Sequence, residues 1–386
     1  MAVPLSYNVR SLYIRRKLTI LAVAGIAVVI GVLIVLMAMA NGFRVALSAT
    51  GSPINAIVTQ RGSNSELSSA ITRDSARVLG DDPLVMKDAN GRALSSPELI
   101  VVANMRRKDG ADVNVTVRGV SQMAFTVRTG ISVTDGRNFQ PGLYEVIVGR
   151  KIFERMEGME IGRSFKLQRR DWTIVGGFDA NASGFESEIW GDVDVIGPAF
   201  NRGGYHSVTL RMRDPSMIGA LNSELEHNPR MQVQAVQERK YYEDQSGVVS
   251  GQLLGLAVFV AIVMGIGAVF GAMNTMYALV AARTREIGTL RALGFSKVSI
   301  LTAFVLESTF LASVGGALGC LIALPANGVT SAAGGTNFSE VAFAFRISGT
   351  SVVVGMGLAV LMGVAGGVLP AFRAARMPIT SALRDA

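Results

Sequence analysis

Residues 282–307 read ARTREIGTLRALGFSKVSILTAFVLE, a short charged segment between two long apolar ones. Within it, Ile287, Leu290, Leu293 and Gly294 recur at spacings close to one face of a helix. A two-faced helix this short, between membrane spans, is expected to lie at the membrane surface and present one face to something outside the bilayer. The same pattern also fits an interfacial loop that only anchors two helices.

The composition of the chain indicates a membrane protein. Hydrophobic residues make up 49% of the 386 residues, and the mean hydropathy is +0.38, too apolar for an ordinary soluble protein. A helix needs about 20 apolar residues to cross the hydrocarbon core. The runs long enough to do so are residues 18–40, 252–281, 298–324 and 351–370. The first run is too long for a cleaved signal peptide, so we expect it to remain as a span.

The distribution of charge orients these spans. The chain carries a net charge of +8, whereas residues 41–251 hold equal numbers of acidic and basic residues. The basic excess lies before the first span, between the second and third, and after the fourth. By the positive-inside rule these segments are cytoplasmic, and residues 41–251 form a large outer domain. The basic residues flank spans and do not interleave with aromatic residues, which argues against nucleic-acid binding.

The outer domain is predicted to have an α+β fold. It opens with strand, helix and strand patterns and closes with another such unit over residues 207–236, around a β-rich insertion at about 121–205. Residues 238–251 fit either a stalk helix leading into the second span or a plain linker. The other expected segments are an amphipathic cytoplasmic helix at 1–17, a cytoplasmic coupling helix at 282–297, an outer loop at 325–350 and a cytoplasmic tail at 371–386.

Two further features lie in the spans. Glycines four residues apart allow close helix packing, within the chain or between two copies. These pairs are Gly267 and Gly271, Gly315 and Gly319, and Gly363 and Gly367. Glu307 is the one acidic residue inside a predicted span, where a charge is costly. We expect it to steady a helix contact, although a surface position or a protonated carboxyl also fits.

Nothing in the sequence indicates catalysis. We find no phosphate-binding loop, no nucleophile elbow and no zinc-protease motif. Cys320 is the only cysteine, and His206 and His227 are isolated and expected at the surface. The acids of the outer domain are likewise expected to be solvated. We therefore expect a chain that is not an enzyme and binds no metal or cofactor itself.

Two motifs carry a resemblance to a known family. The first is RTREIGTLRALG at Arg283–Gly294, and the second is PAFRAARMP at Pro370–Pro378. Together with the layout of one span, a large outer domain and three more spans, they resemble the permease family of the macrolide exporter MacB and the division protein FtsX, the type VII ABC transporters. The basic segment around Arg15-Arg16-Lys17 is similar as well.

The resemblance implies a mechanical role. Members work as dimers of the permease with two ATPase subunits, which hold ATP and Mg²⁺, and pass motion to the outer domain by mechanotransmission. The implied ATPase-docking residues of the coupling helix are Arg283, Arg285, Glu286, Ile287, Leu290, Arg291, Leu293 and Gly294. Supporting residues in the tail are Arg373, Arg376 and Pro378. This chain shows no fused ATPase and is expected to resemble the split members.

The function expected on this basis is a permease subunit in a bacterial inner membrane that exports or extracts a substrate at the periplasmic side. A periplasmic adaptor and an outer-membrane duct often accompany such permeases, but the sequence does not require them. Three alternatives stay open. They are an FtsX-like regulator that activates a cell-wall hydrolase, a lipoprotein-releasing permease, and a membrane-anchored binding domain without an ATPase. The size of the outer domain favours the transporter over the regulator.

Overall fold

The structure is a computed structural model that describes residues 16–228, 231–333 and 341–378. The chain forms two compact units. A helical unit holds the chain up to Gly42, Ser250–Val329 and the chain from Phe345, and a domain holds Phe43–Val249 and Thr330–Ala344. The amphipathic helix predicted at residues 1–17 lies outside the described residues, apart from the two at its end.

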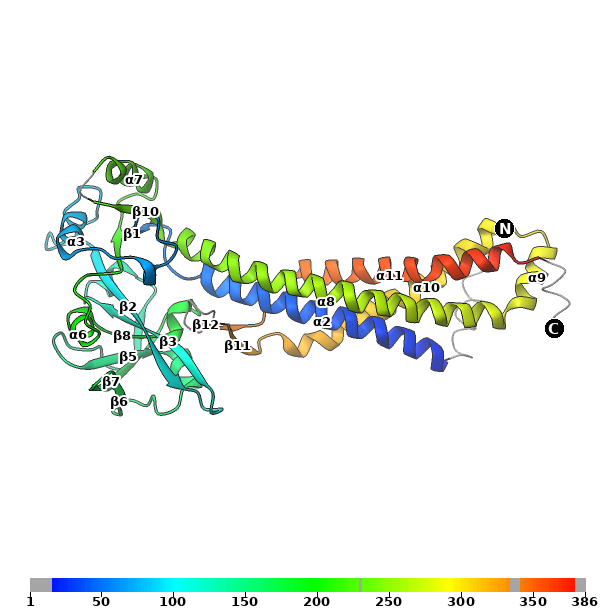
Figure 1. Ribbon diagram of the computed structural model, residues 1–386, viewed down its shortest axis with the longest axis horizontal. Coiled ribbons are helices and arrows are strands. Elements are labelled where there is room, and N and C mark those ends of the chain that lie inside the picture. Colours follow the sequence, from blue (N-terminus) through cyan, green and yellow to red (C-terminus); the bar gives the residue numbers. More distant parts are fainter. Residues whose placement is uncertain (1–15, 229–230, 334–340, 379–386) are drawn as a thin grey trace. The chain divides into compact units, whose positions relative to one another are not determined.

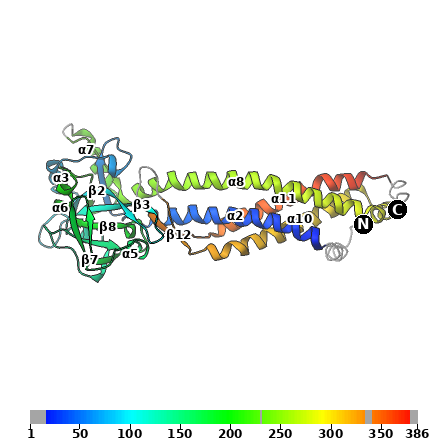
Figure 2. The same cartoon turned by 60° about the horizontal axis from the view of Figure 1, so that its bottom comes forward.

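Long apolar helices build the helical unit. They are α2 (Arg16–Ser48), α8 (Glu238–Ala282), α10 (Lys297–Ala323) and α11 (Gly349–Arg376). Each is long and apolar enough to cross a membrane, which confirms the predicted arrangement of one span, a domain and three spans. The four run side by side in Figures 1 and 2. Large side chains such as Phe259, Phe270 and Leu361 remain exposed on them, as expected of a surface that faces lipid.

Three of the four helices, α2, α8 and α11, are longer than the apolar runs that predicted them. α2 continues through Ser48, and α11 continues to Arg376, so the start of the predicted tail is helical. α8 starts at Glu238, and residues 238–251 are therefore the beginning of one continuous helix rather than a linker. An apolar composition indicates only the part of a helix that lies in hydrocarbon. The helical hydrogen bonds of the backbone can continue beyond it into polar residues.

Glycines bring three of these helices close together. A Cβ atom on Gly315 or Gly319 of α10 would lie 2.8 or 2.6 Å from a carbonyl oxygen of α2. A Cβ atom on Gly363 of α11 would lie 2.6 Å from the Cβ atom of Ala312 in α10, and one on Gly367 would overlap Ser308. Two of the three predicted glycine pairs therefore lie at helix contacts within the chain.

The domain is built on a ten-stranded sheet in the order β10-β1-β9-β2-β3-β8-β5-β7-β4, with β6 paired to β7. The strands are β1 (Asn55–Gln60), β2 (Ser95–Arg106), β3 (Asp112–Val120), β4 (Ser132–Gly136), β5 (Glu145–Gly149), β6 (Ser164–Leu167), β7 (Arg170–Asp179), β8 (Glu188–Asp192), β9 (Ser207–Arg211) and β10 (Val233–Gln237). Its short helices are α3 (Arg73–Gly80), α4 (Ala124–Val127), α5 (Arg150–Arg155), α6 (Val193–Ala199) and α7 (Met217–His227), with 3₁₀ turns η1 (Glu66–Ser68) and η2 (Gly184–Ser187).

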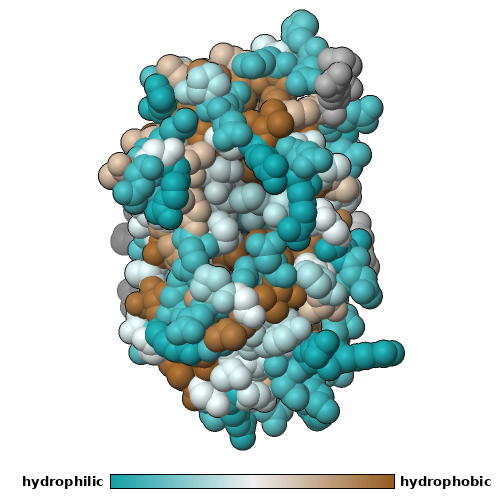
Figure 3. Space-filling model, turned by 90° about the vertical axis from the view of Figure 1, so that its left-hand side faces the viewer, coloured by the Kyte–Doolittle hydropathy of each residue, from teal (hydrophilic) through white to brown (hydrophobic). Residues whose placement is uncertain are grey.

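The two ends of the domain interleave, as the repeated strand-helix-strand pattern predicted. β1 from the opening segment pairs with both β9 and β10 from the closing one. The long strands β2 and β3 form an antiparallel hairpin that joins this half of the sheet to the half containing β8, β5, β7 and β4. The predicted α+β domain is therefore confirmed. Figure 3 shows one face of it, which is mainly hydrophilic with small, separate hydrophobic patches.

The segment between α10 and α11 adds a hairpin to the domain. Sequence reasoning treated residues 325–350 as an outer loop, but β11 (Thr330–Ala333) pairs with β12 (Val341–Ala344). The amide N–H of Ala342 donates to Ser187 Oγ at 2.9 Å, and Lys151 Nζ donates to the carbonyl oxygen of Ala342 at 3.0 Å. Strands of only four residues are too short to be recognised from alternation.

Candidate functional site

The coupling helix is α9 (Thr284–Ala292), and its first contact is a buried ion pair. Arg283, the residue before the helix, places Nη1 2.9 Å from Glu307 Oε2 in α10. Only 6% of the Arg283 side chain and 1% of the Glu307 side chain are exposed. The guanidinium also lies over the Phe304 ring at 5.9 Å. Arg283 is therefore not available on the outer surface of this chain, where the family resemblance placed it.

Two further residues hold α9 against the bundle. Ile287 is buried in a cluster with Leu279 of α8, Ile300 of α10 and Ala374 of α11. Arg291 Nη1 donates to the carbonyl oxygen of Ala375 at 2.7 Å, near the end of α11. A cation bound to these last carbonyl groups is favoured by the helix dipole. The helix is thus fixed to α8, α10 and α11 along its inner side.

The opposite side of α9 is exposed. Arg285, Glu286 and Gly294 lie at the surface, Leu290 is half-buried, and 71% of Leu293 is exposed. Gly294 has φ of +93°, a left-handed conformation that glycine adopts without strain and that ends the helix. A mixed surface of one apolar and two charged side chains therefore faces outward, and ATPase docking on it stays a prediction.

The predicted supporting residues lie close to the same end of the bundle. Arg373 and Arg376 belong to the last turns of α11 and are exposed. The Arg373 guanidinium lies 5.7 Å from the centre of the Tyr277 ring in α8, and that of Arg376 lies 4.0 Å from the Phe372 ring. Pro378 is exposed just after the helix. Their aromatic contacts keep the two guanidinium groups extended along the helix surface.

The third glycine pair behaves differently from the other two. A Cβ atom on Gly267 or Gly271 would meet nothing within 4 Å. Both glycines line an apolar groove of about 580 Å³ between α2 and α8, with Gly25, Val28 and Met264 among its other walls. Among the described residues, this pair therefore does not mark a close approach of two helices.

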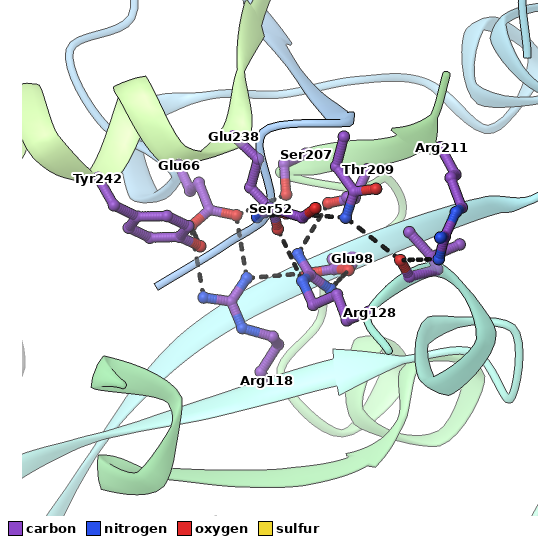
Figure 4. Close-up of polar contacts among 12 residues, drawn as sticks. Ser52, Glu66, Glu98, Arg118, Arg128, Ser207, Thr209, Arg211, Glu238 and Tyr242 are labelled. Carbon is purple, nitrogen blue, oxygen red and sulfur yellow. Dashed lines mark hydrogen bonds and ion pairs between the residues drawn. The ribbon is translucent and has the colours of Figure 1, made fainter. Parts of the chain in front are cut away.

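The domain contains a buried ionic network that sequence reasoning missed, shown in Figure 4. Arg128 Nε lies 2.7 Å from Glu238 Oε1, at the first residue of α8, and its Nη atoms contact both oxygens of Glu98. Glu98 and Glu238 are 0% exposed. Arg118 bridges Glu98 to Glu66 and Glu188, at 2.9, 3.0 and 2.7 Å.

Neutral donors complete this network. The remaining lone pairs of its carboxylates accept hydrogen bonds at 2.6–3.3 Å from Ser207, Tyr242, Trp190, Asn55 and the amide of Ser52. Burial alone raises the pKa of Glu98, but the charges of Arg128 and Arg118 outweigh it and lower the pKa of that carboxyl below its ordinary value. The network joins β2, β3, β8, β9 and the first turns of α8.

The expectation that the domain acids are solvated is wrong for these four glutamates, and His206 is also buried rather than at the surface. A signal was present in the sequence. Glu98 directly precedes the apolar run Leu-Ile-Val-Val, and Arg118 stands between Val117 and Gly119-Val120, so both charges lie beside apolar residues within their strands. A charge inside such a strand must be buried with a partner.

In the part of the chain that the structure describes, no group of three His, Cys, Asp or Glu side chains could hold a metal ion. The carboxylates of the network are occupied by guanidinium groups and neutral donors. The contacts can therefore fix elements within each unit: α9 against α8, α10 and α11, and the first turns of α8 against the sheet.

Comparison with known proteins identifies the family. Residues 19–228 match the MacB-like periplasmic core domain, and residues 258–379 match the FtsX-like permease C-terminal family. The chain is 26% identical over 406 residues to the macrolide export ATP-binding/permease protein MacB of Acinetobacter baylyi. It is 24% identical over 405 residues to the pyoverdine export ATP-binding/permease protein PvdT of Pseudomonas entomophila. Each alignment covers 97% of this chain and 58% of the relative, so the chain spans less than two thirds of their length.

Solved structures include two similar domains. The extracellular domain of the transporter YknZ aligns with 47% of this chain and 99% of its own length, at 16% identity and a TM-score of 0.37. The periplasmic region of MacB from Actinobacillus actinomycetemcomitans aligns with 50% of this chain and 92% of its own, at 11% identity and the same TM-score. On the two family matches, which together cover most of the sequence, this chain belongs to the MacB- and FtsX-like family of ABC transporter permeases.

Proposed function

We propose that this chain couples ATP hydrolysis by a partner ATPase to the export or extraction of a substrate at the outer face of a bacterial inner membrane, by mechanotransmission. Both termini are then cytoplasmic, and ATP and Mg²⁺ are held by the ATPase dimer. The observation that carries the proposal is the mounting of α9. Its outer side is open for docking, while Arg283 and Arg291 tie its inner side to α10 and α11.

These contacts suit a helix that is displaced when the ATPase moves. The Arg283–Glu307 pair is buried, and a buried pair cannot be broken without leaving an uncompensated charge in an apolar surrounding. A displacement of α9 is therefore passed to α10 and α11 rather than absorbed at the membrane surface. α8 ends at Ala282, directly before α9, and begins at Glu238 in the domain, so one continuous helix connects the docking segment to the ionic network.

The spans offer little to a polar substrate. In the described part of the bundle, Arg283 and Glu307 form a buried ion pair at 2.9 Å. The other large buried side chains of the bundle, such as Ile30, Ile34 and Met362, are apolar. A hydrophilic path between the helices would need polar lining. This supports handling of the substrate outside the membrane.

A second copy of the chain completes the proposal. The open groove beside Gly267 and Gly271 allows the backbone of another span to approach closely. A single cysteine in place of Val28, on a Cys320→Ala background, should form a disulfide-linked dimer in native membranes. An equally exposed single cysteine in place of Leu361 is the control. Cross-linking that is no greater at residue 28 than at residue 361 would contradict this contact.

The docking assignment is tested by reversing one charge on the open side of α9. Glu286→Lys should greatly reduce co-purification of the ATPase from gently solubilised membranes, while the protein remains folded and inserted. Glu224→Lys, on an exposed position of α7, makes the same charge change and should leave co-purification intact. Full ATPase recovery with Glu286→Lys would show that docking occurs elsewhere. Recovery of a cell-wall hydrolase with the native chain would instead favour the regulator.

A further inference from the structure

The helix α8 carries three glycines within nine residues, at 247, 251 and 255, each four residues after the last. All three are exposed, and a Cβ atom added to any of them would meet nothing within 4 Å. Glycine is the poorest helix former except proline, because its backbone loses the most freedom on becoming helical. Close packing within this chain does not account for these glycines, unlike those at Gly315 and Gly363.

Their position coincides with a division of the chain. The domain ends in α8 at Val249 and the helical unit begins at Ser250, between the first and second of these glycines. Glycines also lie near other points at which the chain passes from one unit to the other. The division in α2 follows Gly42, and the one before β11 lies just after Gly328. Three of the four points of division therefore have a glycine within two residues.

The helix is held on both sides of the three glycines. On the N-terminal side, Glu238 is bonded to Arg128 and Asn55, and Tyr242 is buried against Phe185. On the C-terminal side, Ala257 and Ala261 are buried beside Leu33 of α2. Between these two anchors lie the three glycines, which have a weak helical preference and whose added Cβ atoms would meet nothing within 4 Å. A helix fixed at two ends bends where it is least supported, and glycines are among the known causes of such bends.

We propose that residues 247–255 of α8 form a hinge, at which the helix changes direction between two supported segments. The use of this hinge in a working cycle rests on the proposed function, but the existence of the hinge does not. Hinges absorb backbone rotation over a few residues while the segments on either side stay rigid. The buried network would then keep the first two turns of α8 moving as one body with the sheet.

The hinge is tested by measuring the distance between two spin labels on α8, one on each side of residues 247–255. Nitroxide labels replace Lys240 and Phe259, both exposed, on a Cys320→Ala background. The labelled chain is diluted with unlabelled chain and reconstituted in lipid nanodiscs. A straight helix separates the two positions by about 28 Å, at 1.5 Å per residue. The native chain should give a broad distance distribution that extends below this value.

Replacing all three glycines with alanine should narrow the distribution around about 28 Å, because alanine stiffens the helix and fits without collision. Gly251→Ala alone should give an intermediate width. Gly357→Ala in α11, a glycine that is equally open, is the matched control and should leave the distribution unchanged.

A native distribution already as narrow as that of the triple variant would overturn the hinge. A triple variant that changes contact between copies but not this distance would also overturn it. Loss of ATPase docking alone would bear on the proposed function, not on the hinge.

Discussion

Arg128 offers the sharpest test of the reasoning about the domain. Its guanidinium is 3% exposed and contacts Glu238, Glu98 and Thr209 through all three nitrogens. Methionine in its place keeps a similar length and apolar character but removes every one of these donors. Among the described residues, the variant Arg128→Met then leaves the carboxylate of Glu238 with two donors, the amide of Ser52 and the Asn55 side chain, at 2.9 Å each.

The expected loss is large. Breaking a buried ion pair from one side destabilises a protein by about 3–5 kcal/mol, because the partner charge stays buried without compensation. For a unit of this size each kcal/mol lowers the melting temperature by roughly 2–4 °C, so the expected fall is roughly 6–20 °C. Glu98 retains Arg118 at 2.9 Å, which places the expectation towards the lower part of this range.

The assay follows from the composition of the chain. Its two tryptophans, Trp172 and Trp190, are both fully buried in the domain, so intrinsic fluorescence reports domain unfolding without a signal from the spans. Thermal unfolding of the full chain in detergent compares Arg128→Met with Arg137→Met. Arg137 makes an equally short two-pronged contact with Glu145, but at the surface, where screening by water weakens it. Equal melting temperatures for the two variants would refute the argument.

A mutant cycle then separates the pair from the rest of the network. Arg128→Met leaves the Glu238 carboxylate buried without its ionic partner, and Glu238→Gln removes that charge. The double variant should therefore lose less stability than the two single variants combined. Strict additivity would mean that Arg128 acts through Glu98 alone.

Three further outcomes follow from the structure. Burial lowers the pKa of His206 below its ordinary value of about 6.5, so the unfolded domain binds more protons in that range, and domain stability should fall as pH drops below about 6.5. In His206→Asn, melting curves measured between pH 5 and 8 should show a flatter profile, and an unchanged slope would count against this. Gly363→Leu, facing Ala312, should abolish recovery of protease-resistant protein, whereas Gly357→Leu on the same helix should not. Glu307→Ala should lower the temperature of aggregation in detergent more than the double variant Arg283→Met/Glu307→Leu, which removes both buried charges.

The parts of the fold that could be predicted are those with a compositional signal. Four apolar runs gave the spans, and two similar strand-helix-strand segments gave the interleaved ends of the sheet. The extent of α8 could not be read with the same certainty, because residues 238–251 are polar and only their backbone bonds make them part of a long helix. The hairpin β11–β12 was missed because strands of four residues are too short to show a clear alternation.

Site residues were harder to predict, because a sequence motif shows which residues are present but not which way their side chains point. The segment Arg283–Gly294 contains one short helix, Thr284–Ala292, and within the segment Arg283 and Ile287 are buried. The direction of each side chain depends on where α9 meets α10 and α11, which involves residues such as Glu307 and Ala375 that are distant in sequence. The ionic network depends on even more distant contacts, between positions 66 and 242.

The place of Glu238 shows what the network contributes beyond stability. β10 ends at Gln237 and α8 begins at the next residue, so no linker separates the sheet from the helix. A carboxylate in a first helical turn is already favoured by the helix dipole. Here it also accepts from Arg128, Asn55 and Ser52, which approach it from different elements. An apolar side chain could fill the space with similar stability, but it would have no preferred direction. Several directed bonds instead fix the rotation of the first turns of α8 about the helix axis relative to the sheet. Additivity in the cycle of Arg128 and Glu238 would remove the basis for this argument.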